Sequence, residues 1–200
     1  MNKCVGGLKV NQCLFQDEDS GSIPTSTLQY KIIPISYGIA KAVYAKHHYL
    51  ADKDFMNIRS YGALYDGVIL GSISFGLPNA KEMKGLFTKD NQSGVFEIVR
   101  LAFDDRCPKN SESRLIGISI KLIRKAEQVK LIISYADTGQ GHEGIIYKAT
   151  GFKDRGLTAK KTDFKFADGR VRKTKEIKYS KQEGEWIPRS RKILFIKDFR

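Results

Sequence analysis

The segment Lys130–Asp137, with the sequence KLIISYAD, limits the possible fold more than any other part of this chain. A strand that is apolar on both faces belongs in the middle of a sheet that is covered on both sides. The segment ends in an acid, Asp137, and a short glycine-containing loop leads from there to Tyr147 on a predicted helix. Ligands in α/β folds collect at the carboxyl ends of such strands. The pattern therefore predicts a central strand that carries Asp137 to a functional site.

Hydrophobic periodicity and turn residues predict alternating strands and helices around this segment. The predicted strands and strand hairpin are Tyr30–Ser36, Tyr61–Pro78, Val95–Asp105 and Arg189–Phe199, and a basic strand-like stretch covers Phe164–Tyr179. The predicted helices are Tyr37–Leu50, Leu115–Val129 and Glu143–Thr150. Asp-Gly dipeptides predict tight turns inside the hairpin and inside the basic stretch. The order predicts an α/β domain with a mixed central β-sheet flanked by helices.

Domain organisation and compartment follow from length and composition. We interpret residues 1–27, which include the acidic-polar stretch QDEDSGSIPTST, as an N-terminal arm. Residues 28–200 are expected to form a single domain, with a basic part at 153–200. No stretch approaches the roughly 20 apolar residues that span a bilayer, and no apolar segment typical of a signal peptide follows Met1. The 3 cysteines have no CxxC spacing, so reduced thiols in the cytoplasm are expected.

Positive charge is the strongest compositional signal. The chain has 35 Lys and Arg residues against 22 Asp and Glu residues, which gives a formal net charge of +13. Most of the excess lies in residues 153–200, where 16 basic and 7 acidic residues give a net charge of +9. Such a segment is typical of a protein that binds a polyanion, usually nucleic acid. A basic surface that only maintains solubility is the alternative.

Two familiar motifs follow the central strand, and neither holds in its context. Asp137-Thr138-Gly139 is the tripeptide of aspartic proteases, but those enzymes need two such carboxylates in an all-β fold. His142-Glu143 begins an apparent HExxH motif, but Ile146 stands where the second zinc-binding histidine would be. An aspartic protease and a helical zinc site are therefore disfavoured.

Polar residues at two other places are candidate site residues. His48 and Tyr49 stand near the end of a predicted helix, where they are either solvated or line a cleft as a general base or metal ligand. Arg100 interrupts the apolar run FEIVRLAF. It lies either on the face of an edge strand or in a polar cleft where it holds an anion, because a buried unpaired guanidinium is costly.

The stretch Lys109–Ser113, KNSES, stands at the start of a predicted helix. Backbone N–H groups and the positive end of the helix dipole bind anions readily at such a place. Capping of the helix by the side chain of Asn110 or Ser111 is the simpler interpretation, and both can hold together.

The order of these elements resembles the GNAT superfamily of N-acetyltransferases. The last helix carries IYKATGF, in which Tyr147, Gly151 and Phe152 match the segment whose tyrosine is the general acid of these enzymes. The resemblance implies that the loop before the Leu115–Val129 helix binds acetyl-CoA or another activated acyl donor. The usual Q/R-x-x-G-x-G/A loop is absent, since RCPKNSESRLIG has no glycine before Gly117. The implied cofactor-binding residues are Lys109, Asn110, Ser111 and Ser113.

Longer segments resemble a narrower family, the Mom-type phage DNA-modification proteins or adenine methylcarbamoylases. The segments are AKHHYL, YGALYDGVILGSISFG, VRLAFDDRCPKNSESRLIG, LIISYADTGQGHEGIIYKATGF and RSRKILF, within Tyr37 to Phe195. Proteins of this family convert the exocyclic amine of adenine in phage DNA to a carbamoylmethyl form, which blocks host restriction. The resemblance implies double-stranded DNA and a small-molecule or carrier-bound donor as partners, in the cytoplasm of the bacterial host.

The same resemblance implies roles for individual residues. The implied catalytic residues are Asp137, Tyr147, Arg100 and Ser113, with His48 and Tyr49 as companions. Asp137 would orient or deprotonate the target amine, Tyr147 would protonate the leaving group or position the donor, and Arg100 would bind the donor. The family has been linked to iron, for which His48 and Asp137 offer nitrogen and oxygen ligands; the metal and its ligands stay open.

The resemblance also implies that the basic segment 153–200 binds DNA. The predicted phosphate contacts are Arg170, Arg172, Lys173, Lys175, Arg189, Arg191 and Lys192. The aromatic residues Phe164, Phe166, Tyr179 and Trp186 interleave with these charges and either stack on a base or pack in a core. An N-acetyltransferase for a small molecule or protein is the main alternative function. A DNA-binding protein with an inactive acyltransferase fold is another, but the coexistence of Arg100, Asp137 and Tyr147 argues against it.

Overall fold

Ten strands and three α-helices make up the computed structural model, which describes residues 22–51, 53–78, 93–173 and 183–200. The strands are β1 (Lys31–Ile35), β2 (Arg59–Tyr65), β3 (Val68–Gly76), β4 (Val95–Phe103), β5 (Leu131–Asp137), β6 (Lys153–Leu157), β7 (Thr162–Phe166), β8 (Val171–Lys173), β9 (Gly184–Pro188) and β10 (Lys192–Asp198). The helices are α1 (Tyr37–His47), α2 (Ser111–Ala126) and α3 (Ile145–Ala149), with a short 3-10 helix, η2 (Thr138–Gln140).

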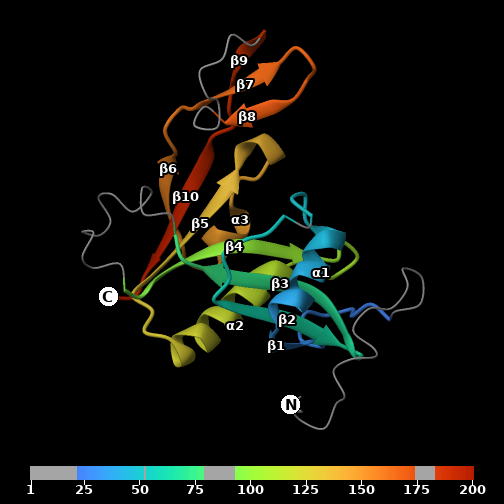
Figure 1. Ribbon diagram of the computed structural model, residues 1–200. Helices are drawn as coiled ribbons and strands as arrows, with labels where there is room; N and C mark the ends of the chain where they lie inside the picture. Colours follow the sequence, from blue (N-terminus) through green and yellow to red (C-terminus); the bar gives the residue numbers. More distant parts are fainter. Residues whose placement is uncertain (1–21, 52, 79–92, 174–182) are drawn as a thin grey trace, which may run out of the picture.

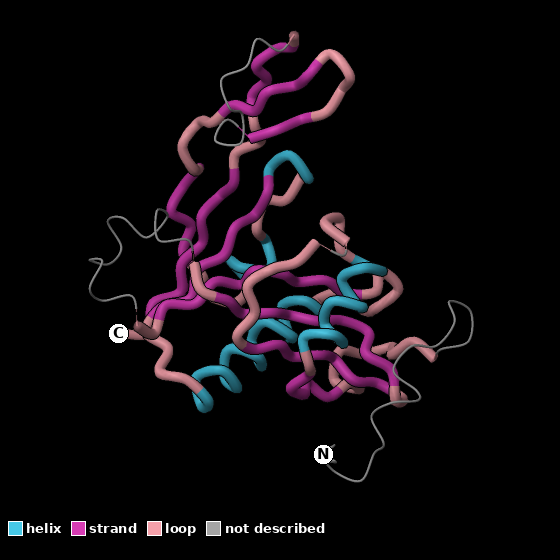
Figure 2. The backbone as a smooth tube through the Cα atoms, in the orientation of Figure 1, coloured by secondary structure: helices cyan, strands magenta, loops and turns pink. Residues whose placement is uncertain are grey.

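The strands form two sheets. In the described part of the chain the larger sheet has seven strands in the order β1-β2-β3-β4-β5-β10-β6, and the smaller has three in the order β8-β7-β9. Strands β5, β10 and β6 extend away from the plane of β1–β4, and the smaller sheet stands beyond their far end (Figure 1). In the described ranges, the helices α1, α2 and α3 lie beside the larger sheet and away from the smaller one (Figure 2). The predicted mixed sheet flanked by helices is confirmed for the larger sheet.

Strand β5 occupies the central place that its apolar sequence predicts. It lies between β4 and β10, and Leu131, Ile132 and Ile133 are all buried. Their side chains alternate between two cores, because Ile132 packs with the cluster around α2 whereas Leu131 and Ile133 pack on the opposite face of the sheet. Both faces of β5 are therefore covered, as a strand without polar alternation requires.

The turn and edge residues explain the first half of the sheet. Asp66 and Gly67 both have positive φ, of 46° and 79°, and close the predicted hairpin between β2 and β3. Pro34 lies within β1, which among the described strands is an edge strand paired with β2 alone, so its missing N–H is tolerated.

Several predicted boundaries are wrong. Helix α2 begins at Ser111 and not at Leu115, because Asn110 adopts the left-handed conformation, with φ of 73°, and turns the chain into the helix early. The side chain of Asn110 makes no capping hydrogen bond, and Ser111 Oγ donates to the carbonyl of Pro108, so the predicted side-chain capping is also wrong. The last strand begins at Lys192.

The basic segment contains more strands than the predicted strand-like stretch Phe164–Tyr179, with its Asp-Gly turn, and the final strand Arg189–Phe199. It supplies β6, the three strands of the smaller sheet and β10. Gly169, with φ of 83°, forms the predicted turn after Asp168, between β7 and β8. Residues 174–182, including Lys175 and Tyr179, lie outside the described part of the chain, as does most of the predicted N-terminal arm.

Strands β4 and β5 are parallel neighbours that pair over a short length only. The register runs from Val95↔Leu131 to Glu97↔Ile133, although both strands continue beyond these residues. On its other side, β4 has a bulge at Val99, because Ile98 pairs with Phe75 and Arg100 pairs with Ser74. The bulge at Val99 therefore lies just past Glu97, where the pairing of β4 with β5 ends. A polar site lies next to this part of β4.

Helix α1 is fixed on the sheet by a buried chain of hydroxyl groups. Tyr44 Oη lies 2.8 Å from Ser74 Oγ and accepts a hydrogen bond from Ser72 Oγ at 3.0 Å. Ser74 Oγ in turn lies 2.7 Å from Ser60 Oγ. All four residues are buried. Since a buried hydroxyl without a partner is costly, this network selects one position of α1 on β2 and β3.

The variant Tyr44→Phe tests this anchor. It removes a hydrogen-bond partner from both Ser72 and Ser74 in a buried place, so we expect the free energy of unfolding to fall by about 1–3 kcal/mol. The matched control is Tyr37→Phe on the same helix, which removes an exposed hydrogen bond from Tyr37 to Asp54. The measurement is equilibrium urea unfolding of both variants. A loss no greater for Tyr44→Phe than for Tyr37→Phe would contradict the anchoring role.

Candidate active site

Arg100 stands on β4 just past the Val99 bulge. Its guanidinium lies over the ring of Phe55, with Cζ 5.2 Å from the ring centroid, and Nη1 donates to the Val99 carbonyl at 2.8 Å. The Nε atom is buried and has no hydrogen-bond partner among the described residues. Strand β4 is an interior strand, so the edge-strand interpretation of Arg100 is wrong. A half-buried cation with an unused donor is suited to holding an anion or a carbonyl oxygen.

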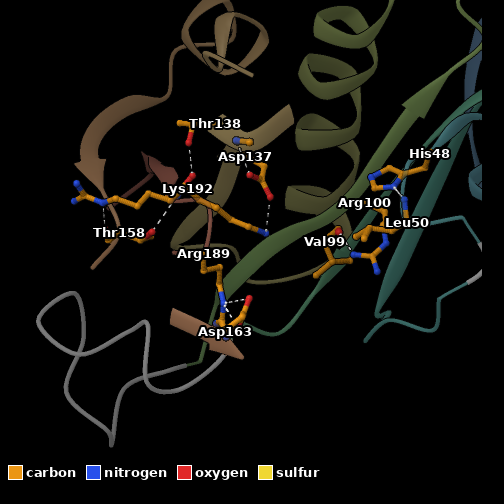
Figure 3. A network of polar contacts seen from close by, with 12 residues as sticks. His48, Leu50, Val99, Arg100, Asp137, Thr138, Thr158, Asp163, Arg189 and Lys192 are labelled. Carbon is orange, nitrogen blue, oxygen red and sulfur yellow. Dashed lines mark hydrogen bonds and ion pairs between the residues drawn. The ribbon is translucent and has the colours of Figure 1, made fainter. Parts of the chain in front are cut away.

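His48 follows α1 as its C-cap residue and lies beside Arg100 (Figure 3). Its Nδ1 accepts a hydrogen bond from the backbone N–H of Leu50 at 3.0 Å. Burial, and after it the positive charges of Arg100, His142 and Lys192, lower the pKa of His48 to about 4. The imidazole is therefore neutral at pH 7. Since Nδ1 is an acceptor, the ring proton is on Nε2, and His48 presents an N–H donor.

Tyr49 connects helix α1 to the loop that follows β5. Its ring stacks on His48, with the centroids 4.5 Å apart and the planes 22° apart, and meets His142 edge-on at 6.4 Å. Burial raises the pKa of Tyr49, and the Asp137 carboxylate raises it further. The phenol is therefore protonated at neutral pH and lies within electrostatic reach of Asp137.

Asp137 ends β5 directly opposite Lys192 on the antiparallel strand β10. Lys192 Nζ lies 3.8 Å from Asp137 Oδ2, and Asp137 Oδ1 accepts the backbone N–H of Gly139 at 3.0 Å. Figure 3 shows the two side chains pointing toward each other. Gly139 is required here, because a Cβ atom would lie 2.6 Å from the Cβ of Ser190. The carboxylate, 14% exposed, is thus held by one N–H and one ammonium group.

Tyr147 reaches the same region from α3. It is buried against Phe152 and Phe195, whose ring centroids lie 5.7 Å and 5.3 Å from its own. Burial raises the pKa of Tyr147, and negative charge on Tyr49 or Glu97 would raise it further. The phenol therefore keeps its proton at neutral pH, as a general acid must.

The predicted cofactor-binding residues form a separate group at the start of α2. Ser113 Oγ donates to the Asn110 carbonyl at 3.1 Å, Ser111 Oγ donates to the Pro108 carbonyl, and Lys109 is exposed. The left-handed Asn110 supplies the backbone conformation for which glycine is usually used. Ser113 therefore belongs to the first turn of α2, apart from the charged group formed by Arg100, His48, Tyr49 and Asp137.

The predicted DNA-contacting residues fall into two groups, one on the smaller sheet and one where the two sheets join. Arg172 and Lys173 are exposed on β8, and Arg170 pairs with Asp168 at 2.6 Å in the adjoining turn. The other described candidates, Arg189, Arg191 and Lys192, lie where the smaller sheet joins the larger one. Arg189 pairs with Asp163, Arg191 Nε donates to the Thr158 carbonyl at 2.7 Å, and Lys192 faces Asp137 (Figure 3). Lys175 lies outside the described residues.

Sequence reasoning missed two members of the charged group. His142 belongs to it through Tyr49 and His48, although the failed zinc motif gave no reason to keep it. Lys192 was assigned to DNA phosphates but faces Asp137. The pairing of RSRKILF with the central strand would have revealed this contact. In that antiparallel pair, Lys192 lies opposite Asp137, the last residue of β5.

The described residues do not fit the iron site that the family resemblance suggests. Among them, no group of three or more His, Cys, Asp and Glu side chains is close enough to hold a metal ion. His48 also lacks a free lone pair in its neutral form, because Nδ1 accepts the Leu50 N–H and Nε2 carries the proton. We therefore derive no step through iron.

Known structures define the fold class. Over 84% of this chain and 98% of the other, the protein superimposes on Arabidopsis thaliana NAA60 in complex with acetyl-CoA, with a TM-score of 0.55 and 13% identity. A Bacillus subtilis acetyltransferase in complex with CoA gives a TM-score of 0.53 at 13% identity, over 86% of this chain and 99% of that one. The fold is that of the GNAT N-acetyltransferases, as predicted.

The family is narrower than this class. The model of the Mom protein family matches residues 29–199, and the chain belongs to that family. The methylcarbamoylase Mom of Escherichia phage Mu is 28% identical over 129 residues, which cover 62% of this chain and 52% of that protein. The chain thus aligns with about half the length of this relative. None of the helices in the described ranges is long and apolar enough to cross a membrane.

The ionisation of His48 is directly measurable. We expect its NMR titration midpoint near pH 4, against 6.5 for an ordinary histidine. The unfolded chain binds more protons than the folded one between these values, so this group lowers stability as the pH falls from about 6.5 to about 4. His48→Gln assigns the resonance and should flatten this part of the stability curve. A midpoint near 6.5 would contradict the buried, neutral imidazole.

Proposed function

We propose that the protein modifies DNA adenine, converting its exocyclic amine to the carbamoylmethyl form and so protecting phage DNA from restriction. The proposal rests on membership of the Mom family and on similarity to the Mu methylcarbamoylase. The observation that supports it most is that Arg100 and Asp137 both lie within electrostatic reach of Tyr49 where β4 and β5 diverge, with Tyr147 within reach of the same phenol. Arg100, Asp137 and Tyr147 offer an anion-binding cation, a carboxylate and a protonated phenol.

Asp137 acts on the amine in this proposal. The exocyclic amine of adenine is a weak nucleophile that must lose a proton as its nitrogen gains a bond. The carboxylate, held by Gly139 and facing Lys192, can orient one N–H and accept its proton.

Arg100 and His48 hold the donor. The unpaired Nε of Arg100 needs an acceptor, and the His48 Nε2–H supplies a second, neutral donor beside it. A carbonyl or carboxylate oxygen of the donor satisfies both. Because His48 is neutral at pH 7, it adds a hydrogen bond without further positive charge.

The α2 loop and Tyr147 complete the arrangement. The start of α2, with Lys109, Asn110, Ser111 and Ser113, is proposed to hold an anionic part of the donor. Two structures with this fold contain acetyl-CoA or CoA, which makes an activated acyl carrier one candidate donor. Acetyl transfer alone does not join nitrogen to a CH₂ group, so the donor must present that carbon to the amine. Tyr147 protonates the group that leaves.

The DNA must also open for this reaction. The amine of a paired adenine lies in the stacked duplex, and extrusion of the base costs a few kcal/mol. The basic segment 153–200, with Arg170, Arg172 and Lys173 among its cations, is proposed to hold the phosphates and offset part of that cost.

Mass spectrometry of nucleosides from plasmid DNA tests the proposal. Cells that express the chain should contain a new adenine nucleoside with the mass of the carbamoylmethyl form. Asp137→Asn keeps the hydrogen bond from Gly139 but removes the base, so the yield should fall by at least about a hundredfold. Tyr147→Phe should have a similar effect.

The matched control is Asp198→Asn, which changes another carboxylate at the end of a strand, outside the charged group. It should leave the yield unchanged. Full modification by both Asp137→Asn and Tyr147→Phe would contradict the roles assigned to them. Unmodified adenine in cells with abundant folded protein would contradict the function itself and favour N-acetyl transfer, with coenzyme A binding as the next measurement.

A further inference from the structure

The three-stranded sheet β8-β7-β9, called here the arm, has an aromatic centre. Phe164 on β7 is buried, and its ring meets Phe166 and Trp186 at centroid distances of 5.0 Å each, in T-shaped contacts. Trp186 nevertheless stays 54% exposed. Phe164 is therefore the packing residue of this centre, while a large face of the Trp186 indole is open.

Strand register places cations on the same face as this indole. Phe164 is opposite Arg172 on β8 and opposite Trp186 on β9, so the three side chains form a row across the arm. The Arg170 guanidinium lies 5.4 Å from the centroid of the Phe166 ring, close to the same row. Aromatic and guanidinium groups thus alternate on one face.

The acidic side chains of the arm's strands lie on the other face. Asp163 and Glu185 occupy the alternate positions of β7 and β9, where Asp163 pairs with Arg189 and Glu185 lies 3.7 Å from Lys165. The two faces therefore differ in charge. Opposite charges pair with one another on one face, and Arg172 and Trp186 stand together on the other.

The arm is also attached to the catalytic loop. Both the N–H and the Oγ1 of Thr138 donate to the carbonyl of Arg191, at 3.2 Å and 2.7 Å. Thr138 follows Asp137, and Arg191 follows β9 at the root of the arm. A ligand on the arm therefore has a defined position relative to Asp137.

We propose that this face of the arm binds DNA and that Trp186 stacks on a base beside the extruded adenine. The inference rests on the proposed function and assigns its base contact to a single residue. Extrusion of one base exposes the faces of its neighbours, and an indole can cover such a face in any sequence context. Arg170 and Arg172 then reach the flanking phosphates.

Charge selects DNA over other partners for this face. Residues 158–191 contain 11 basic and 5 acidic residues, and an open indole between guanidinium groups matches the alternation of base and phosphate along a strand. A polyanion without bases would engage the guanidinium groups but leave the indole uncovered.

Trp186 is the 1 tryptophan of the chain, so its fluorescence reports this site alone. The experiment titrates the full-length protein with a duplex that contains an abasic gap opposite thymine, as a mimic of the extruded site, and separately with heparin. Both ligands should bind in a salt-dependent way. Only the duplex should quench the Trp186 emission strongly, because only DNA provides bases for stacking.

Variants separate stacking from folding. Trp186→Ala should weaken duplex binding by roughly tenfold or more, leave heparin binding unchanged and lower the yield of modified adenine. Trp186→Phe, which retains a stacking ring, should restore most of the affinity. The control is Val171→Ala, an equally exposed apolar residue on the opposite face of the arm, which should change neither.

Three results would overturn the inference. Equal quenching by heparin and duplex, duplex binding without quenching, or unchanged affinity in Trp186→Ala would each remove the base contact. If modified adenine still formed in these cases, the proposed function would stand and only the role of Trp186 would fail. Absence of both DNA binding and modified adenine would reject the proposed function together with the inference.

Discussion

The short parallel pairing between β4 and β5 is the constraint on which the rest of this structure depends. Three residue pairs, Val95↔Leu131 to Glu97↔Ile133, hold the two strands together before they part. Strand β4 remains paired with β3, and β5 remains paired with β10, so each is stable beyond the divergence. In the described part of the chain, the facing edges of β4 and β5 are not paired with each other beyond these residues. Side chains from the end of α1, from β4 and from β5 come together at this divergence, around Tyr49.

The balance of charge at this place suits both proposed ligands. Arg100 and Lys192 supply two cations, and Asp137 supplies one carboxylate. His48 adds no charge, because burial and these same cations keep its imidazole neutral. A charged imidazole at His48 would repel Lys192 and weaken its approach to Asp137. The proposed reaction needs this balance, with cations for an anionic donor and one carboxylate as a base. The environment of His48, more than its chemical type, decides that it donates a hydrogen bond.

The sequence was sufficient for the features that depend on local pattern, and insufficient for those that depend on long-range pairing. The apolar run of β5 predicted a central strand, and the acid that ends it proved to lie within the charged group. The turn between β7 and β8 was predicted, but the third strand of the arm was not, because Gly184–Pro188 is short and pairs with residues distant in the chain. The alternation of inward and outward side chains along these strands can be recognised only once Phe164 is known to be buried. His142 was missed for a related reason, since its link to Tyr49 is a contact between loops.

The junction between the arm and β10 couples binding to chemistry through adjacent residues. Arg191 donates from its guanidinium to the carbonyl of Thr158, at the root of one strand of the arm, and its own carbonyl accepts both donors of Thr138. The next residue, Lys192, faces Asp137. These contacts tie the root of the arm to both neighbours of the carboxylate, the backbone that follows it and the ammonium opposite it. Rigid attachment is what the reaction needs, because a base held on the arm must place its neighbour's amine within hydrogen-bond reach of Asp137. The contacts of Arg189 and Arg191 within the protein serve this attachment, so the proposal assigns the phosphates to Arg170 and Arg172 further out on the arm.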